Sequence, residues 1–185
     1  MSAITTSSAV DLQQQIANLD IALDRDSFMR ALIRELADVL CDVVGVQQAS
    51  AFISVVGQNM GRSLDQQYRQ ALNVPELNRE QVAAVLADLK QRIRGRFRVI
   101  ECSERHIVLA SDTCPFEEKV TGQKAMCMMT SNVFGSIAAD NLGYAKVELR
   151  ETIAEGAPAC VVAVHLQLDA ATDRIDGREY FKIAR

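Results

Sequence analysis

The segments that decide the fold are CPF (114–116), CMMTSNVFG (127–135), GYAKV (143–147) and GAPAC (156–160). Apolar residues recur at three- and four-residue spacing over 126–141, which predicts a helix that ends at Gly143. Residues 144–149 and 160–168 on either side have the pattern of strands. This interval therefore predicts a helix set among antiparallel strands, and it contains three of the five cysteines.

Helical patterns occupy the chain before this interval. A stripe of apolar residues predicts an amphipathic helix that Asp24 or Asp26 caps and Gly45 ends, and we expect the stripe to be buried: Phe28, Leu32, Ile33, Leu36, Val39, Leu40 and Val43. A second helix is expected from Ala49 onward and a shorter one over 12–23. Gly57 and Gly61 share one face of the second helix, which indicates close packing against another helix.

The remaining patterns complete the fold class. The second helix should end at 73–75, and Asn78 with Gln81 resembles a capping box at the beginning of another helix. Residues 97–102 and 106–109 read as a strand hairpin. Helices followed by a helix among antiparallel strands predict an α+β fold. We expect a partly helical extension over 1–24, one domain over 25–168 and a tail over 169–185.

Composition excludes several classes of protein. The chain has 185 residues, 49% of them hydrophobic and 24% charged, with a net charge of −4. That balance is typical of a globular domain and does not favour direct nucleic-acid binding, which needs a basic face. The basic run over 90–98 is interpreted as a solvated helix end. Without a signal peptide or an apolar run of membrane-spanning length, a cytoplasmic protein with reduced thiols is expected.

The cysteines are the best candidates for chemistry. We expect Cys114, Cys127 and Cys160 to converge from a loop, a helix and a strand, as the thiolate ligands of zinc or an iron–sulfur cluster do. A position near a helix N-terminus should lower the pKa of Cys127. The spacing matches no compact metal motif, so three buried, unreactive cysteines are the alternative. His106 or Cys102 is a possible fourth ligand, with Glu117, His165 or an exogenous group also open.

Catalysis has little support in the sequence. The chain contains no nucleophile elbow, phosphate-binding loop or dinucleotide motif. Cys127 with a histidine as base would be the only nucleophilic arrangement, and nothing marks an orienting carboxylate. We therefore interpret the protein as not an enzyme.

The segments quoted at the start, together with Thr152 to Ala154, resemble the methanogen output domain. This is a small sensory module found alone or attached to histidine kinases and other signalling proteins, and the similarity spans about residues 25–168. The module looks related to the 4-vinyl reductase domain, a ligand-binding α+β fold also similar to transport-particle subunits. In that group a closing Gly-x-x-x-Cys pattern helps to form a metal or small-molecule site, and Gly156 with Cys160 fits it. The family's other cysteine is absent over 150–153, which leaves room for Cys114.

The resemblance implies a stand-alone sensory domain. Its three-cysteine site, Cys114, Cys127 and Cys160, would hold an iron–sulfur cluster or zinc and report redox, gas or small-molecule status to a partner such as a kinase or transcription regulator. The alternative is a metal-free module that binds a small apolar ligand, with structural cysteines. By analogy we expect a homodimer built on the first long helices, and no membrane association.

Overall fold

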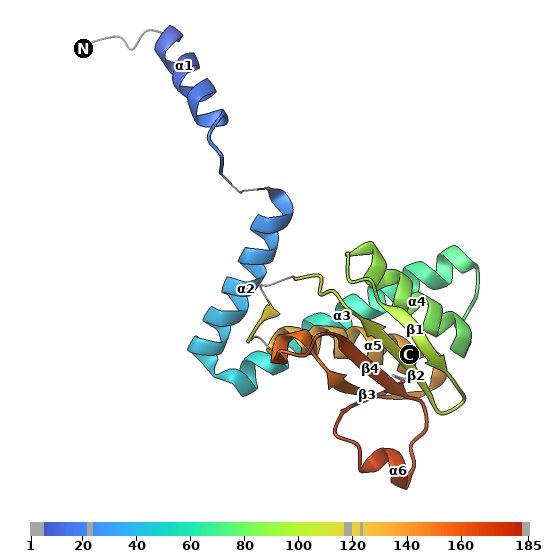
Figure 1. Cartoon of the computed structure of the whole chain (residues 1–185). Helices are drawn as coiled ribbons and strands as arrows, with labels where there is room; N and C mark the ends of the chain where they lie inside the picture. The colour runs from blue at the N-terminus through green and yellow to red at the C-terminus, as the bar shows by residue number, and fades with distance from the viewer. Residues whose placement is uncertain (1–5, 22–23, 117–119, 123, 183–185) are drawn as a thin grey trace.

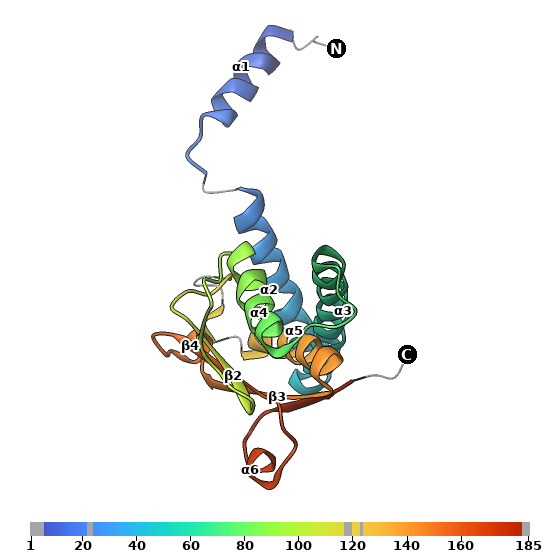
Figure 2. The same cartoon turned by 90° about the vertical axis from the view of Figure 1, so that its right-hand side faces the viewer.

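An antiparallel sheet forms one layer of the computed structural model, which describes residues 6–21, 24–116, 120–122 and 124–182. Five strands within these ranges follow the order β1-β2-β4-β3-β5. Their bounds are β1 (Arg98–Cys102), β2 (His106–Ser111), β3 (Tyr144–Glu151), β4 (Cys160–His165) and β5 (Arg178–Phe181). Helices α3, α4 and α5 all lie on one side of this sheet (Figure 2). The prediction of an α+β fold is confirmed.

The helices precede the sheet or are inserted into it. They are α1 (Thr6–Ala17), α2 (Arg25–Val44), α3 (Val46–Leu72), α4 (Arg79–Arg92), α5 (Lys124–Leu142) and the short α6 (Ala170–Asp173), with a 3-10 turn η2 (Ile153–Glu155). Helix α1 lies away from the other described elements (Figure 1). It ends at Ala17, before the expected boundary near residue 23. None of the helices in the described ranges is long and apolar enough to cross a lipid bilayer.

Local sequence signals explain where the helices begin and end. The Asp24 carboxylate accepts from the N–H groups of Asp26 and Ser27, and Gly45 ends α2 with a φ of +82°. The predicted capping box of Asn78 and Gln81 is present at the beginning of α4. These contacts satisfy N–H groups that the first turn of a helix leaves without partners.

Helix α5 forms the centre of the molecule, between the sheet and α3 (Figure 2). Phe134 and Ile137 are fully buried in the core. The predicted close packing of Gly57 and Gly61 is confirmed, because a Cβ on Gly57 would lie 2.7 Å from the Asn132 Cβ. A Cβ on Gly61 would lie 3.1 Å from the Ser136 Cβ and within 3.3 Å of the Val133 backbone. The two glycines thus let α3 and α5 approach closely.

One expectation about the edge of the domain is corrected. The apolar stripe of α2 was expected to be buried, yet Leu36, Val39 and Val43 are 62%, 54% and 76% exposed. In the segment after 168, the apolar residues Tyr180, Phe181 and Ile183 were expected to pack on the sheet. There β5 pairs with β3 and places Tyr180 in the core, whereas Ile183 lies outside the described residues. The folded unit therefore extends at least to Phe181.

Candidate functional site

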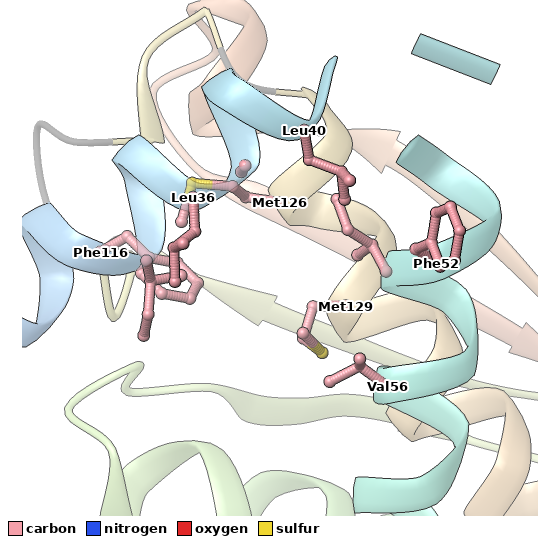
Figure 3. Close-up of a pocket in the computed structure, with 10 residues that line it drawn as sticks. Leu36, Leu40, Phe52, Val56, Phe116, Met126 and Met129 are labelled. Atoms are coloured by element: carbon pink, nitrogen blue, oxygen red, sulfur yellow. The ribbon is translucent and has the colours of Figure 1, made fainter. Parts of the chain in front are cut away.

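An apolar pocket lies between α2, α3 and the beginning of α5 (Figure 3). Its volume is about 250 Å³. Every side chain that lines it is apolar: Ile33, Leu36, Ala37, Leu40, Phe52, Ile53, Val56, Phe116, Met126 and Met129. An apolar cavity of about 150 Å³ suffices for benzene. The pocket can therefore hold a molecule of one or two rings, or a short hydrocarbon chain.

The pocket lies where α2 stands apart from the closely packed pair of α3 and α5, and polar contacts are among those that hold α2 in place. Arg34 of α2 donates to the Thr121 carbonyl (3.2 Å), and Asp26 contacts Arg94 (3.4 Å). In the middle of α2, small Ala37 is the buried residue and reaches the pocket. Apolar side chains therefore do not fill the space between α2 and the α3–α5 pair.

The three predicted cysteines come together behind one wall of this pocket. Cys114 and Cys127 pack in a small apolar cluster with Phe116 and Met126, both of which also line the pocket. Cys160 is the first residue of β4, and its sulfur accepts from the Ile153 N–H (3.4 Å). The three thiols are close enough to influence one another electrostatically. The three cysteines therefore lie in the same region of the domain, and their role as ligands of one site stays a prediction.

The electrostatics of Cys127 differ from the sequence-based expectation. Burial, followed by the neighbouring Cys160 and Cys114, raises the pKa of Cys127 to about 12. Its position in the second turn of α5 does not outweigh the cost of placing a charge away from water. The prediction of a lowered pKa was wrong. A neutral thiol at physiological pH also speaks against Cys127 as a nucleophile.

A buried lysine, which sequence reasoning missed, lies among these thiols. Lys90 is 6% exposed, and its Nζ donates to the Thr130 hydroxyl (2.7 Å) above the rings of Phe97 and Phe134. Burial lowers the Lys90 pKa to about 8, against the opposing influence of the three cysteines. The basic run was interpreted as solvated, which holds for Arg92, Arg94 and Arg96 but not for Lys90. Lys90 follows buried Leu86 by four residues and so lies on the same face of α4, which was the available signal that it is buried.

The proposed fourth ligands lie at the wrong end of the sheet. In the antiparallel pairing of β2 with β4, His106 lies opposite His165, whereas Ser111 lies opposite Cys160. Cys160 and His165, at the two ends of β4, are five residue steps apart, about 17 Å at the usual rise per residue. Cys102 is in β1 beside this far end, and His106 contacts Glu101 there (2.8 Å). Neither Cys102 nor His106 can complete a site with Cys160, nor can His165, and Glu117 lies outside the described residues.

The residues present do not fit a metal as they stand. Across the described ranges, no group of three or more histidine, cysteine, aspartate or glutamate side chains is spaced to hold a metal ion. The ammonium group of Lys90 also lies near the three thiols and would repel a cation. The iron–sulfur cluster and zinc thus stay predictions from sequence.

We expect Cys127 to be far less reactive than the exposed Cys102. A thiol of pKa about 12 is almost wholly protonated at pH 8, and only the thiolate attacks iodoacetamide. Its alkylation should rise about tenfold for each pH unit and lag that of Cys102 by at least tenfold at pH 8. Peptide mass spectrometry of timed samples measures both rates in one protein. Equal rates at pH 8 would refute this account of Cys127.

Solved structures share the fold at low sequence identity. The phenol-responsive sensory domain of the transcription activator PoxR, solved with phenol, aligns with a TM-score of 0.58 and 13% identity, covering 79% of this chain and 76% of that one. A trafficking protein particle complex subunit 3 from Naegleria fowleri, covalently bound to palmitic acid, gives 0.56 and 15%, covering 77% and 95%. No curated protein sequence matches the chain.

A family model matches most of the chain. The model for methanogen output domain 1 aligns with residues 32–165, from α2 to the end of β4, and so includes the pocket and all three clustered cysteines. Kinship with the 4-vinyl reductase domain stays a prediction. The chain belongs to the methanogen output domain 1 family.

Proposed function

We propose that this chain is a sensory domain whose signal is a small apolar molecule bound in the pocket between α2, α3 and α5. The observation that carries the proposal is a lining made only of apolar side chains. Phe52, Phe116 and the thioethers of Met126 and Met129 provide aromatic and polarisable surface, which suits hydrocarbons and aromatic rings. The similar folds of a phenol-responsive sensory domain and a palmitate-bound subunit support a ligand-binding role.

The lining also predicts which ligands bind best. No side chain that lines the pocket can donate or accept a strong hydrogen bond. A hydroxyl group inside it would lose its hydrogen bonds to water without replacement, at a cost of roughly 1–3 kcal/mol. Bare hydrocarbons such as toluene and naphthalene should therefore bind more tightly than phenol.

The position of α2 is the expected output. Its contacts with the rest of the domain include polar ones at its beginning, Asp26 to Arg94 and Arg34 to Thr121. A ligand in the pocket would add apolar contacts to Leu36 and Leu40 and favour one placement of α2. A signalling partner, such as a kinase or transcription regulator, would respond to that placement.

Calorimetry with a filled-pocket variant tests the proposal. We expect toluene and naphthalene to bind wild-type protein, with phenol at least tenfold weaker. In the variant Ala37→Leu, three added carbons occupy the cavity and should weaken toluene binding at least tenfold. Ala31→Leu is the matched control, because Ala31 is on the same helix but does not line the pocket. No binding by wild type, or equal binding by folded Ala37→Leu, would contradict the proposal.

A further inference from the structure

Helix α2 has its apolar side outward. Phe28, Leu32, Leu36, Val39 and Val43 are between 39% and 76% exposed. The opposite side carries half-buried or buried Arg30, Arg34, Ala37 and Asp38. A helix on the surface of a monomer normally buries its apolar stripe, so this orientation indicates that something covers α2 in the working protein.

The exposed surface continues onto α3. Seven large apolar side chains on α2 and five on the first half of α3 form what we call the outer face: Phe28, Met29, Leu32, Ile33, Leu36, Val39, Val43, Val46, Phe52, Val55, Val56 and Met60. Twelve side chains at about half exposure present on the order of 1,000 Å², more than the roughly 300–600 Å² of the largest patch on a typical monomer. Stable dimers bury about 800 Å² per partner.

The pocket opens on this same face. Leu36, Phe52 and Val56 belong both to the outer face and to the pocket lining, and they are 62%, 58% and 49% exposed. Whatever covers the outer face also covers the mouth of the pocket. In the monomer a bound hydrocarbon would stay partly in water, so the pocket is incomplete without that cover.

The charges at the two ends of α2 favour a second copy of the chain. At the beginning of the helix, Asp24 is engaged as the cap and Asp26 pairs with Arg30 and Arg94, beside exposed Arg25. In the last turn, Asp42 is exposed. A two-fold axis crossing the middle of α2 would bring Arg25 near Asp42 of the partner subunit, and Asp42 near the partner subunit's Arg25. Two-fold dimers are the commonest assemblies, and their interfaces are self-complementary in this way.

We propose that a second copy packs its outer face against this one, with the two α2 helices antiparallel, and closes the pocket over the ligand. Ligand binding and dimerisation then strengthen each other by the same factor, because both act on one equilibrium. The dimer follows from the outer face alone, whereas its coupling to a ligand rests on the function proposed above.

Sedimentation velocity of the full chain at about 50 µM tests the dimer. Wild type should sediment as a dimer. Val39→Glu places a charge on the outer face but outside the pocket lining, and it should raise the dimer dissociation constant at least tenfold. Ala84→Glu, at an exposed position of α4, is the control and should remain dimeric. A folded wild-type monomer, or an undiminished Val39→Glu dimer, would overturn the proposal, and circular dichroism confirms that each variant is folded.

Exchanging the charges at the two ends of α2 tests whether a second copy of the chain covers the outer face. Arg25→Glu should weaken the dimer, and Arg25→Glu combined with Asp42→Arg should restore it, because both unlike pairs are re-formed with reversed sign. Failure of the double variant to regain dimer affinity would rule out the antiparallel arrangement. A heterologous partner or the protein's own α1 on this face would leave wild type monomeric, which also counts against the proposal.

The coupling has its own measurement. Saturating toluene should lower the wild-type dimer dissociation constant at least tenfold, and monomeric Val39→Glu should bind toluene correspondingly less tightly. A wild-type dimer that binds no toluene would refute the proposed function and leave the dimer standing. Equal toluene affinity of monomer and dimer would refute the coupling and leave the function standing.

Discussion

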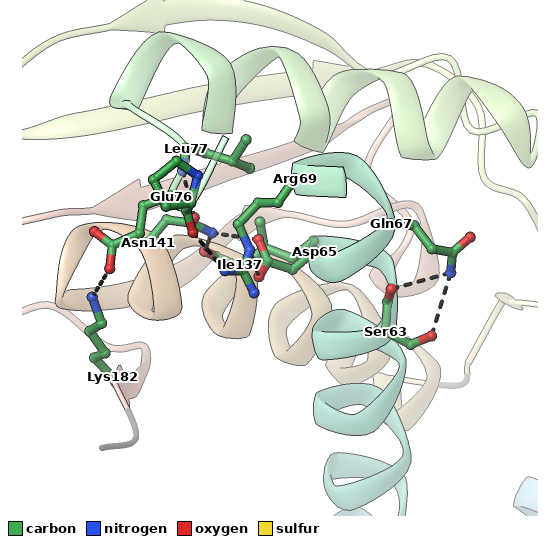
Figure 4. A network of polar contacts seen from close by, with 10 residues as sticks. Ser63, Asp65, Gln67, Arg69, Glu76, Leu77, Ile137, Asn141 and Lys182 are labelled. Carbon is green, nitrogen blue, oxygen red and sulfur yellow. Dashed lines mark hydrogen bonds and ion pairs between the residues drawn. The ribbon is translucent and has the colours of Figure 1, made fainter. Parts of the chain in front are cut away.

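Replacing Asp65 by alanine is expected to lower the free energy of unfolding by about 3–5 kcal/mol, because it breaks a buried ion pair. Asp65 on α3 is fully buried. Its Oδ1 accepts from the Asn141 amide (2.6 Å), and its Oδ2 lies 2.8 Å from the Arg69 Nε (Figure 4). The Arg69 N–H is not well directed at that oxygen, so this second contact is an ion pair rather than a hydrogen bond.

The network around Asp65 joins three parts of the core. Asn141 on α5 also donates to the Ile137 carbonyl (2.8 Å) and accepts from the Leu77 N–H (2.7 Å) just before α4. Loss of the carboxylate leaves the Arg69 charge without its partner and removes an acceptor from Asn141. The cost of these uncompensated groups, rather than the strength of the original pair, produces the large expected effect.

Arg92→Ala is the matched control. Arg92 pairs with Asp88 at the same four-residue spacing and a similar distance (2.6 Å), but the two side chains are 70% and 43% exposed. In this variant Asp88 keeps its hydrogen bond from the Tyr68 hydroxyl. An exposed ion pair contributes at most about 1 kcal/mol. Urea unfolding at one protein concentration compares the variants. A loss in Asp65→Ala no larger than that in Arg92→Ala would contradict the role given to burial.

Replacing Gly135 by alanine is expected to lower the free energy of unfolding by about 2 kcal/mol. A Cβ at this position in the middle of α5 would lie 2.1 Å from Cδ2 of Tyr180. The ring cannot easily move, because the Tyr180 hydroxyl is hydrogen-bonded to Ser131 (3.0 Å) and Asn132 (3.2 Å) in the core. Overpacking costs roughly 1–3 kcal/mol or more, and the higher helix propensity of alanine returns up to about 1 kcal/mol.

The sign of this effect should reverse when the ring is removed. In a Tyr180→Ala background the clash is relieved, because the three atoms of residue 180 nearest to the added Cβ are gone, and Gly135→Ala should become stabilising by about 0.5–1 kcal/mol through helix propensity alone. Thermal or urea unfolding of the four proteins in this double-mutant cycle gives the coupling directly. An equal destabilisation in both backgrounds would show that contact with Tyr180 is not why residue 135 is glycine.

Local signals predicted much of the fold. The capping box at Asn78, the end of α2 at Gly45 and the close approach at Gly57 and Gly61 each depend on residues near one another in sequence or on one helix face. The apolar pattern of α2 correctly predicted a helix. We expected its apolar side to be buried, whereas that side is exposed. Periodicity shows that one face is apolar, and it does not show whether the same chain or another covers that face.

The candidate site was only partly predictable. The grouping of Cys114, Cys127 and Cys160 was expected from the loop, helix and strand that carry them, and the resemblance strengthened it. Cys102 and His106 were misplaced because strand register decides which end of the sheet a residue occupies. The burial of Lys90 was not predicted, because the arginines that follow it made the whole run resemble a solvated helix end. The pocket depends on the gap between α2 and the α3–α5 pair, which is a property of three-dimensional packing rather than of any sequence segment.

Methyl NMR of methionine-labelled protein tests the central claim most directly. The chain has six methionines, of which Met126 and Met129 line the pocket, while Met128 between them does not. On titration with toluene, we expect saturable shifts of the Met126 and Met129 methyl signals, intermolecular contacts from these two methyls to the ring, and little change at Met128. A spectrum in which the Met126 and Met129 signals stay unchanged at saturating toluene would contradict a ligand site between α2, α3 and α5.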